Sequence, residues 1–278
     1  QGFFAPWGIE TLDEADVEPG TYLTDHLTDR AIDCIRRRDP DRPFFMHLSH
    51  YAVHTPIQAP EPLVEKYRRK AARLRLDQVD PMVVGESLGA THMAGHRVTR
   101  RVLQSNPVYA AMVENLDHNI GRVLQCLDEQ GLGDDTLVLF TSDNGGLATM
   151  EGSPTCNAPY AEGKGWGYEG GVRVCQMARW PGRIRAGARC AEAVTSTDFN
   201  PTCLSAAGLP LQEAQHCDGV DLLPVLEEQT PRLGRDAVFW HYPHYGNQGG
   251  SPCAAMLSHP WKLLWHFERP DEPELYHL

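Results

Sequence analysis

An acid and an amide stand together at Asp143 and Asn144, in the segment Ser142-Asp143-Asn144-Gly145. A carboxylate beside a carboxamide offers two hard oxygen ligands, which suit Ca²⁺ or Mg²⁺ better than zinc. The pair directly follows an apolar run, and ligands of open α/β sheets bind beyond the carboxyl ends of strands. The same residue types also close ordinary turns, so a metal-ligand pair and a plain turn are both open readings of this segment alone.

A lysine flanked by glycines forms a second candidate, Lys164, in the segment from Gly163 to Arg173. Such a lysine can bring a positive charge close to a bound oxyanion, with backbone N–H groups nearby. The segment is not a Walker A loop, because no Ser or Thr follows Lys164. A flexible surface loop is the alternative. Within the segment, Glu169 and Arg173 are expected to brace the lysine rather than to touch substrate.

Three histidines complete the set of candidates. His54, in His54-Thr55-Pro56, could donate a proton to a leaving group, although a lone histidine is often structural. His241 and His244 lie in an aromatic stretch, where they could line a substrate pocket or pack within strands. Asp198 is expected to orient nearby backbone and not to be catalytic.

Helices and strands that would position these residues alternate along the first half of the chain. Helical spacing of apolar residues predicts a helix over 21–38, and a short apolar run predicts a buried strand over 44–49. Residues 61–106 are predicted to form a helix followed by a surface loop. A helix is expected over 107–130 and a central buried strand over 136–141. This order indicates an α/β fold with a largely parallel sheet.

The second half of the chain changes character. Residues 145–171 are rich in glycine and small polar residues and are typical of a long functional loop. Short aromatic runs over 237–242, 254–257 and 261–267 predict antiparallel strands. The expected division is therefore a main domain over 1–232 and the start of an antiparallel subdomain over 233–278.

Composition excludes several classes of function. The 278 residues carry a formal net charge of −12, which argues against a nucleic-acid partner. No apolar run has the length needed to cross a bilayer. None of the eight cysteines lies in a CxxC pair, which argues against a structural zinc site. Cys34 and Cys126 are predicted to be small core residues of helices; disulfide pairing among the others, Cys217 included, stays open.

Several ordered motifs together resemble the sulfatase family of the alkaline-phosphatase superfamily. The resemblance covers nearly the whole chain. The segments that carry it are Phe44–Ser49 through His54-Thr55-Pro56, Asn106–Asp117, Thr141–Gly146, Lys164–Arg173, Thr197–Thr202 and Trp261-Lys262-Leu263.

The resemblance implies a fold and a chemistry. The expected fold is α/β and alkaline-phosphatase-like, with a mainly parallel sheet flanked by helices and a small antiparallel C-terminal part. In that family a formylglycine attacks the sulfate ester, and one divalent cation, usually Ca²⁺ with Mg²⁺ possible, assists. By resemblance, Asp143 and Asn144 hold the cation together with two acids nearer the N-terminus. Lys164 contacts the sulfate, and His54 helps the alcohol to leave.

One departure from the family pattern sets an expectation about the chain itself. No Cys or Ser stands in the Cys/Ser-x-Pro-x-Arg motif that is converted to formylglycine. The sequence is therefore interpreted as an N-terminally truncated fragment, with the formylglycine and the paired acids expected upstream, and inactive by itself.

Substrate and alternatives follow from the same resemblance. The expected substrate is a sulfated small molecule or carbohydrate, the expected compartment is periplasmic or secreted, and the oligomeric state is open. A phosphonate monoester or phosphodiester hydrolase of the same superfamily is one alternative. A non-catalytic binding homologue is another.

Overall fold

The computed structural model describes residues 2–12, 14–88, 93–212, 214–215 and 218–278. Two compact units make up the chain, and each is described by itself. The first comprises Gln1–Pro81 and Leu103–Gly133, and the second Met82–Val102 and Asp134–Leu278. The second unit contains both sides of residue 232, so the boundary predicted between 232 and 233 does not coincide with this division and stays a prediction.

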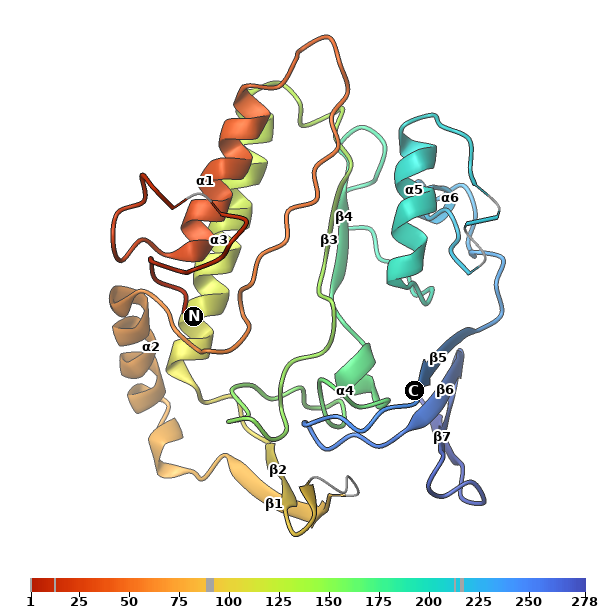
Figure 1. Ribbon diagram of the computed structural model, residues 1–278. Helices are drawn as coiled ribbons and strands as arrows, with labels where there is room; N and C mark the ends of the chain where they lie inside the picture. Colours follow the sequence, from red (N-terminus) through yellow and green to blue (C-terminus); the bar gives the residue numbers. More distant parts are fainter. Residues whose placement is uncertain (1, 13, 89–92, 213, 216–217) are drawn as a thin grey trace. The chain divides into compact units, whose positions relative to one another are not determined.

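Three helices build the first unit: α1 (Leu23–Arg36), α2 (Glu61–Arg73) and α3 (Pro107–Glu129) (Figure 1). The start of α3 is fixed by Asn106, whose side chain accepts hydrogen bonds from the N–H groups of Val108 and Tyr109 at 3.0 and 3.2 Å. This N-cap and a proline at the first helical position both favour helix initiation. The helices predicted over 21–38 and 107–130 are confirmed.

A buried polar contact fixes how α1 and α3 pack against each other. Asp25 Oδ1 accepts hydrogen bonds from Nδ2 of Asn115 at 2.9 Å and of Asn119 at 2.6 Å. Asn119 is fully buried, so these bonds replace the water that its amide would otherwise need. Cys126 is buried as predicted, whereas Cys34 lies exposed on α1, so its assignment to the core was wrong.

Residues 44–49 differ from the prediction of a buried strand. They form no ladder, and Phe45 is 79% exposed. An apolar run of strand length indicates only that its side chains favour burial. A strand also needs a neighbouring strand that pairs with its backbone N–H and C=O groups. Within the part of the chain that the structure describes, no helix is both long and apolar enough to cross a membrane.

A hairpin begins the second unit. Strands β1 (Met82–Ser87) and β2 (Arg97–Arg101) pair antiparallel, with Val84 opposite Thr99. The region 61–106 was predicted as a helix followed by a loop; helix α2 and a short 3-10 turn (η1, Leu76–Gln78) are present, but the hairpin replaces part of the loop. Both strands are mostly exposed or half-buried, so they carry many polar residues. For this reason the sequence shows no apolar pattern that would predict them.

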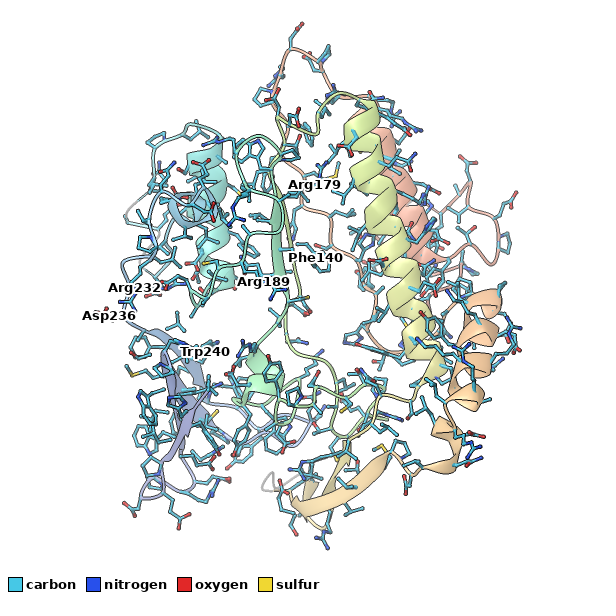
Figure 2. All side chains as sticks on the ribbon, turned by 180° about the vertical axis from the view of Figure 1, so that it is seen from behind. Phe140, Arg179, Arg189, Arg232, Asp236 and Trp240 are labelled. Carbon is cyan, nitrogen blue, oxygen red and sulfur yellow. The ribbon has the colours of Figure 1, made fainter. Side chains whose placement is uncertain are left out.

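The strand predicted over 136–141 is present as β3 (Val138–Thr141), and its partner is β4 (Gln176–Arg179). The two pair antiparallel, with Phe140 opposite Met177 and Val138 opposite Arg179. Figure 2 labels Phe140 on β3 and Arg179 on β4. Residues 142–175, which connect the two strands, therefore begin and end at the same end of this ladder. The α/β class is confirmed, but every ladder among the described strands is antiparallel, so the parallel pairing expected around this strand is not found there.

The C-terminal antiparallel sheet is confirmed. Its strands are β5 (Val238–Tyr242), β6 (Cys253–Ser258), β7 (Trp261–His266) and β8 (Glu274–His277), paired in that order. Along β7, burial alternates: Lys262, Leu264 and His266 are buried, whereas Trp261, Leu263 and Trp265 are exposed. The sheet thus has one face packed against the protein and one apolar face open to solvent.

A buried ion pair anchors helix α5 (Phe199–Ala206), which follows a 3-10 turn (η3, Ser196–Asp198); a short helix, α6 (Leu223–Leu226), lies nearby. The fully buried Asp198 accepts hydrogen bonds from the N–H groups of Thr195 and Val220 at 2.8 and 2.9 Å. Both terminal nitrogens of Arg235 donate to the same carboxylate at 2.7 Å. Asp198 therefore orients backbone, as predicted.

Replacing Arg235 with Met should lower the free energy of unfolding by about 3–5 kcal/mol, because the Asp198 carboxylate would remain buried without its cation. Urea denaturation followed by circular dichroism measures this change. Arg185→Met is the matched control, since Arg185 and Glu228 form an ion pair that is 64% and 51% exposed. Equal denaturation midpoints for the two variants would contradict a stabilising role for the buried pair.

Candidate active site

The turn after β3 presents the two predicted cation ligands. Asp143 Oδ1 accepts a hydrogen bond from the backbone N–H of the next residue, Asn144, at 3.0 Å, which orients the carboxylate. Asn144 Nδ2 donates to the carbonyl of Gly145 at 2.9 Å, so the amide oxygen points away from that carbonyl. The Asp143 side chain is exposed and Asn144 is half-buried. Both oxygens are thus held on a rigid backbone at the protein surface.

Glycine is required behind this turn. The N–H of Gly145 donates to the carbonyl of Gly171 at 2.9 Å. A Cβ at position 145 would lie 1.7 Å from the carbonyl oxygen of Gly170, a distance at which the backbone would have to move. The first glycine of the predicted motif therefore permits a close approach of two backbone segments.

The Lys164 segment meets the same turn on its other side. The backbone N–H of Lys164 donates to the carbonyl of Gly146 at 3.1 Å. The side-chain amide of Asn157 joins the two segments again, donating to the carbonyls of Gly146 at 2.8 Å and Glu162 at 2.9 Å. The structure therefore brings Asp143, Asn144 and Lys164 together in one substructure, which their separation along the chain does not reveal.

Two further contacts fix the Lys164 segment. Trp166 Nε1 donates to Thr149 Oγ1 and to the carbonyl of Gln248, both at 3.0 Å. The short helix α4 (Glu169–Val172) ends the segment, and Arg173 lies 3.5 Å from the Glu169 carboxylate. Glu169 and Arg173 thus contact each other, and their bracing of the Lys164 segment stays a prediction for Arg173.

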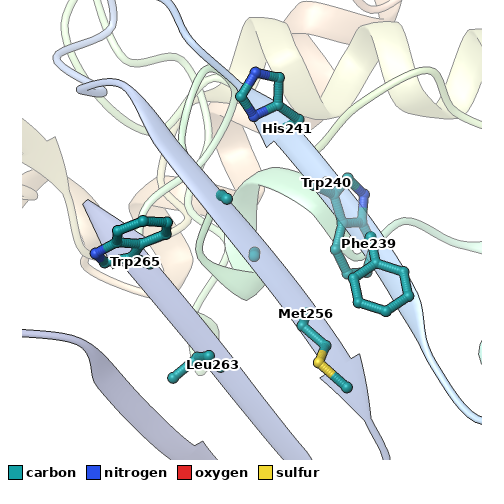
Figure 3. A pocket seen from close by; sticks show the side chains of 8 residues that line it. Phe239, Trp240, His241, Met256, Leu263 and Trp265 are labelled. Carbon is teal, nitrogen blue, oxygen red and sulfur yellow. The ribbon is translucent and has the colours of Figure 1, made fainter. Parts of the chain in front are cut away.

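His241 and His244 lie differently with respect to Lys164. His241 belongs to the outer face of the C-terminal sheet, where it lines a shallow apolar hollow with Phe239, Met256 and Trp265 (Figure 3). The ladder register puts His241 on the same face as Trp265, and the Lys164 segment contacts the opposite face. The structure therefore does not bring His241 to Lys164.

His244 is exposed and follows β5, with its ring 5.3 Å from that of Tyr242. It leads into residues 246–250, which pack closely against Gly165. Of the two histidines, His244 is the one whose loop reaches the Lys164 segment. The assignment of either histidine to substrate binding stays a prediction.

His54 belongs to the first unit, whereas the other candidates belong to the second. Its backbone N–H donates to the carbonyl of Tyr51 at 2.9 Å, and its ring Nδ1 lies 2.8 Å from the carbonyl of Thr55. A carbonyl only accepts, so Nδ1 carries a proton in this contact. Nε2 is then the nitrogen through which this exposed ring would exchange a proton.

The donor set fits part of a Ca²⁺ or Mg²⁺ site. Asp143 and Asn144 supply two oxygens of the kind these cations prefer. Among the residues that the structure describes, no group of three or more His, Cys, Asp or Glu side chains is arranged to hold a metal ion. The turn would therefore supply two protein ligands to such a cation, and the remaining positions would fall to water or to other groups.

Two functional candidates escaped the sequence analysis: Arg100 on β2 and Lys262 on β7. Arg100 forms an ion pair with Glu162, which directly precedes the Lys164 segment, and Lys262 forms one with Glu169 within it. Lys262 carried a usable signal, because it occupies an inward position of an alternating strand where an apolar residue is usual. Arg100 carried none, since the hairpin that positions it was not predicted.

Comparison with known proteins identifies the class and then the family. A family model described as Sulfatase matches residues 1–209, and one described as N-sulphoglucosamine sulphohydrolase, C-terminal, matches residues 162–278. The fold is that of the alkaline-phosphatase-like α/β class, which the structural neighbours share. The chain belongs to the sulfatase family.

Similar proteins span a wide range of sources. A "Sulfatase" of Formosa agariphila is 33% identical over 98% of this chain and 46% of its own length. Human "Steryl-sulfatase" is 31% identical over 90% of this chain and 35% of its own length. The solved structure of "Ps i-CgsB in complex with k-i-k-neocarrahexaose" has a TM-score of 0.71 and 26% identity, covering 94% of this chain and 49% of that one. The chain thus spans less than half the length of these relatives.

Gly145→Ala should lower the free energy of unfolding by about 1–3 kcal/mol, because the added Cβ meets the Gly170 carbonyl and forces two backbone segments apart. Gly121→Ala is the control: it lies within α3 with open space around the new Cβ and should stabilise by about 0.5–1 kcal/mol. Urea denaturation compares them. A neutral Gly145→Ala would contradict the packing described for the turn.

Calcium binding by the 278-residue chain should be weak, with a Kd of about 10⁻³ M or above, because two protein oxygens leave most of the shell to water. Isothermal titration calorimetry with CaCl₂ measures this affinity. Asp143→Ala should abolish the remaining heat, whereas Asp77→Ala, at a turn far along the chain, should not. Tight stoichiometric binding would show that further ligands are present.

Proposed function

We propose that the natural protein hydrolyses sulfate monoesters and that this chain supplies Asp143, Asn144, Lys164 and His54 to the reaction. Membership in the sulfatase family supports the reaction type. One observation carries the assignment of the site. The hydrogen bond from the Lys164 N–H to the Gly146 carbonyl, 3.1 Å long, joins the lysine segment directly to the turn with the two oxygen ligands.

Asp143 and Asn144 would hold one divalent cation, most often Ca²⁺ in this family, with Mg²⁺ as the alternative. When bound, the cation supplies positive charge that stabilises the sulfuryl oxygens. The turn orients these side chains: the Asn144 N–H donates to the Asp143 carboxylate, and the Gly145 N–H donates to the Gly171 carbonyl. The nucleophile, a formylglycine by family resemblance, is expected outside this chain.

Lys164 would bind the sulfate group. The backbone N–H of Lys164 bonds to the Gly146 carbonyl, and the Trp166 indole bonds to Thr149 and to the Gln248 carbonyl. These bonds hold in place the backbone that carries the ammonium. Charge that is already in position costs no reorganisation as the reaction proceeds, and this makes it more effective than mobile charge.

His54 would protonate the leaving alcohol through Nε2. The contact of Nδ1 with the Thr55 carbonyl fixes both the tautomer and the ring orientation. A positioned general acid of this kind contributes roughly 10²–10⁴-fold to the rate.

The proposed substrate class is a sulfated carbohydrate. The solved structure that carries this proposal, with 26% identity, is described as a complex with k-i-k-neocarrahexaose. A sulfated small molecule is the alternative, which the likeness to human steryl-sulfatase favours. A periplasmic or secreted location stays a prediction.

Lys164→Ala and His54→Ala should each lower kcat on 4-nitrophenyl sulfate by about 10²-fold or more in the complete natural protein, because each removes a group that acts in the transition state. Lys66→Ala, an exposed lysine of α2, is the control and should keep wild-type turnover. Near-wild-type turnover in either site variant would overturn its role. Faster cleavage of a phosphonate monoester than of the sulfate would favour the alternative hydrolase.

A further inference from the structure

Two acidic residues bracket the segment that carries Lys164. Glu162 lies immediately before Gly163, and Glu169 begins helix α4, so six residues separate the two carboxylates. Both side chains are largely removed from solvent, with 13% and 12% exposed. Carboxylates in such places would normally compete with a bound sulfate for Lys164 and repel the anion. Each is instead paired with a cation from another strand.

Arg100 pairs with the acid on the N-terminal side. Its Nε lies 2.8 Å from both carboxylate oxygens of Glu162. Its terminal nitrogens reach Glu86 on the neighbouring strand, with Nη1 to Oε2 at 2.9 Å, and its guanidinium lies 5.7 Å from the centre of the Trp166 ring. Arg100 thus links the β1–β2 hairpin to the beginning and to the middle of the Lys164 segment.

Lys262 pairs with the acid on the C-terminal side. Its Nζ donates to Glu169 Oε1 at 2.6 Å and lies 5.4 Å from the centre of the Trp240 ring. The side chain is only 2% exposed. On the same face of the sheet, Leu264 lies against Gly167, and the His266 ring lies 5.9 Å from the ring of Tyr168, tilted by 42°. The C-terminal sheet therefore holds the far end of the segment.

Burying the charged groups of these two ion pairs costs free energy of desolvation. Burial raises the pKa of the Glu162 carboxyl, and Arg100 offsets this in part. Burial lowers the pKa of the Lys262 ammonium, and Glu169 offsets this in part. Apolar residues of similar volume often stabilise a fold as well as a buried ion pair does, so the pairs are poorly explained by stability. What a buried pair adds is a unique arrangement of the groups it joins.

We propose that Arg100 and Lys262 are positioning residues that clamp the Lys164 segment from both ends through Glu162 and Glu169. The role in catalysis rests on the function proposed above, whereas the clamp itself does not. With the clamp intact, the segment is held closed against the turn at Gly146. Loosening either end lets it open, and the closed fraction of molecules falls.

Kinetics distinguish this role from simple loss of folding. If a variant is closed only a tenth of the time, substrate must pull the segment shut, so KM rises about tenfold while kcat at saturation changes little. A variant of which a fraction is irreversibly misfolded shows the reverse, because fewer molecules are active: apparent kcat falls and KM stays constant. Reversible global unfolding would also raise KM, and it is recognised by lost protection of the α3 amides. Lys164→Ala, which removes the reacting group itself, also lowers kcat.

Amide hydrogen exchange tests the clamp directly in the complete natural protein. In Lys262→Met, exchange of the Lys164 amide, which donates to Gly146, should quicken about tenfold while amides of α3 keep their protection. Lys66→Met is the matched control: its ammonium bonds Glu114 at 2.5 and 2.7 Å but is 54% exposed. This variant should leave the Lys164 amide unchanged.

Two further variants test the clamp with a smaller risk of misfolding. Lys262→Met with Glu169→Gln removes the pair without leaving a buried charge alone, and Glu162→Gln weakens the other end while Arg100 keeps Glu86. Both should also quicken exchange at Lys164. Unchanged exchange in these folded variants would overturn the clamp.

Steady-state kinetics on 4-nitrophenyl sulfate then test the link to catalysis. A tenfold rise in KM with kcat within twofold of wild type supports positioning of Lys164. A fall in kcat at constant KM overturns it. If the wild-type protein cleaves no sulfate ester, the proposed function fails, and hydrogen exchange still decides whether the segment is clamped.

Discussion

Close backbone contact at glycines is the constraint on which the candidate site depends. The turn at 143–146 and the segment at 163–171 touch through main-chain groups, at Gly145 with Gly171 and at Gly146 with Lys164. A side chain at Gly145 would collide with the backbone of Gly170. Because the joined atoms belong to the main chain, the spacing between the oxygen ligands and the lysine is set by the fold itself. The side-chain pairs Arg100–Glu162 and Lys262–Glu169 then contact the two ends of the lysine segment.

The antiparallel pairing of β3 with β4 explains why these segments meet. The ladder begins at Val138 with Arg179 and ends at Thr141 with Gln176, so everything between is an excursion that returns to one place. A long glycine-rich loop would ordinarily lose much entropy on ordering. Here its two ends are already side by side, and the loop is tied at several points to the hairpin and to the C-terminal sheet.

Much of the fold was readable from local patterns, and the failures have physical causes. Helices α1 and α3 were predictable because apolar spacing and the cap at Asn106 act within a few residues. The expected strand over 44–49 failed because ladder partners are non-local, and the polar hairpin was missed for the same reason. Asp143, Asn144 and Lys164 were predicted from residue type and motif, and their contact through Gly146 became visible only in the structure. Arg100 was not predicted, because the hairpin that positions it was missed, and the inward position of Lys262 gained its meaning only from the contact with Glu169.

Side chains alternate between the two faces of a strand, so the C-terminal sheet separates two different chemical surfaces. Lys262 faces the Lys164 segment, whereas its neighbours Trp261 and Leu263 face solvent. The two faces can therefore change their chemistry independently, since a substitution on one does not reach the other. A slip of β7 by one residue would exchange them completely, expelling the ammonium and presenting indole rings to the glycines. The register of β7 thus decides whether the Lys164 segment contacts the Lys262 ammonium or the apolar side chains of Trp261 and Leu263.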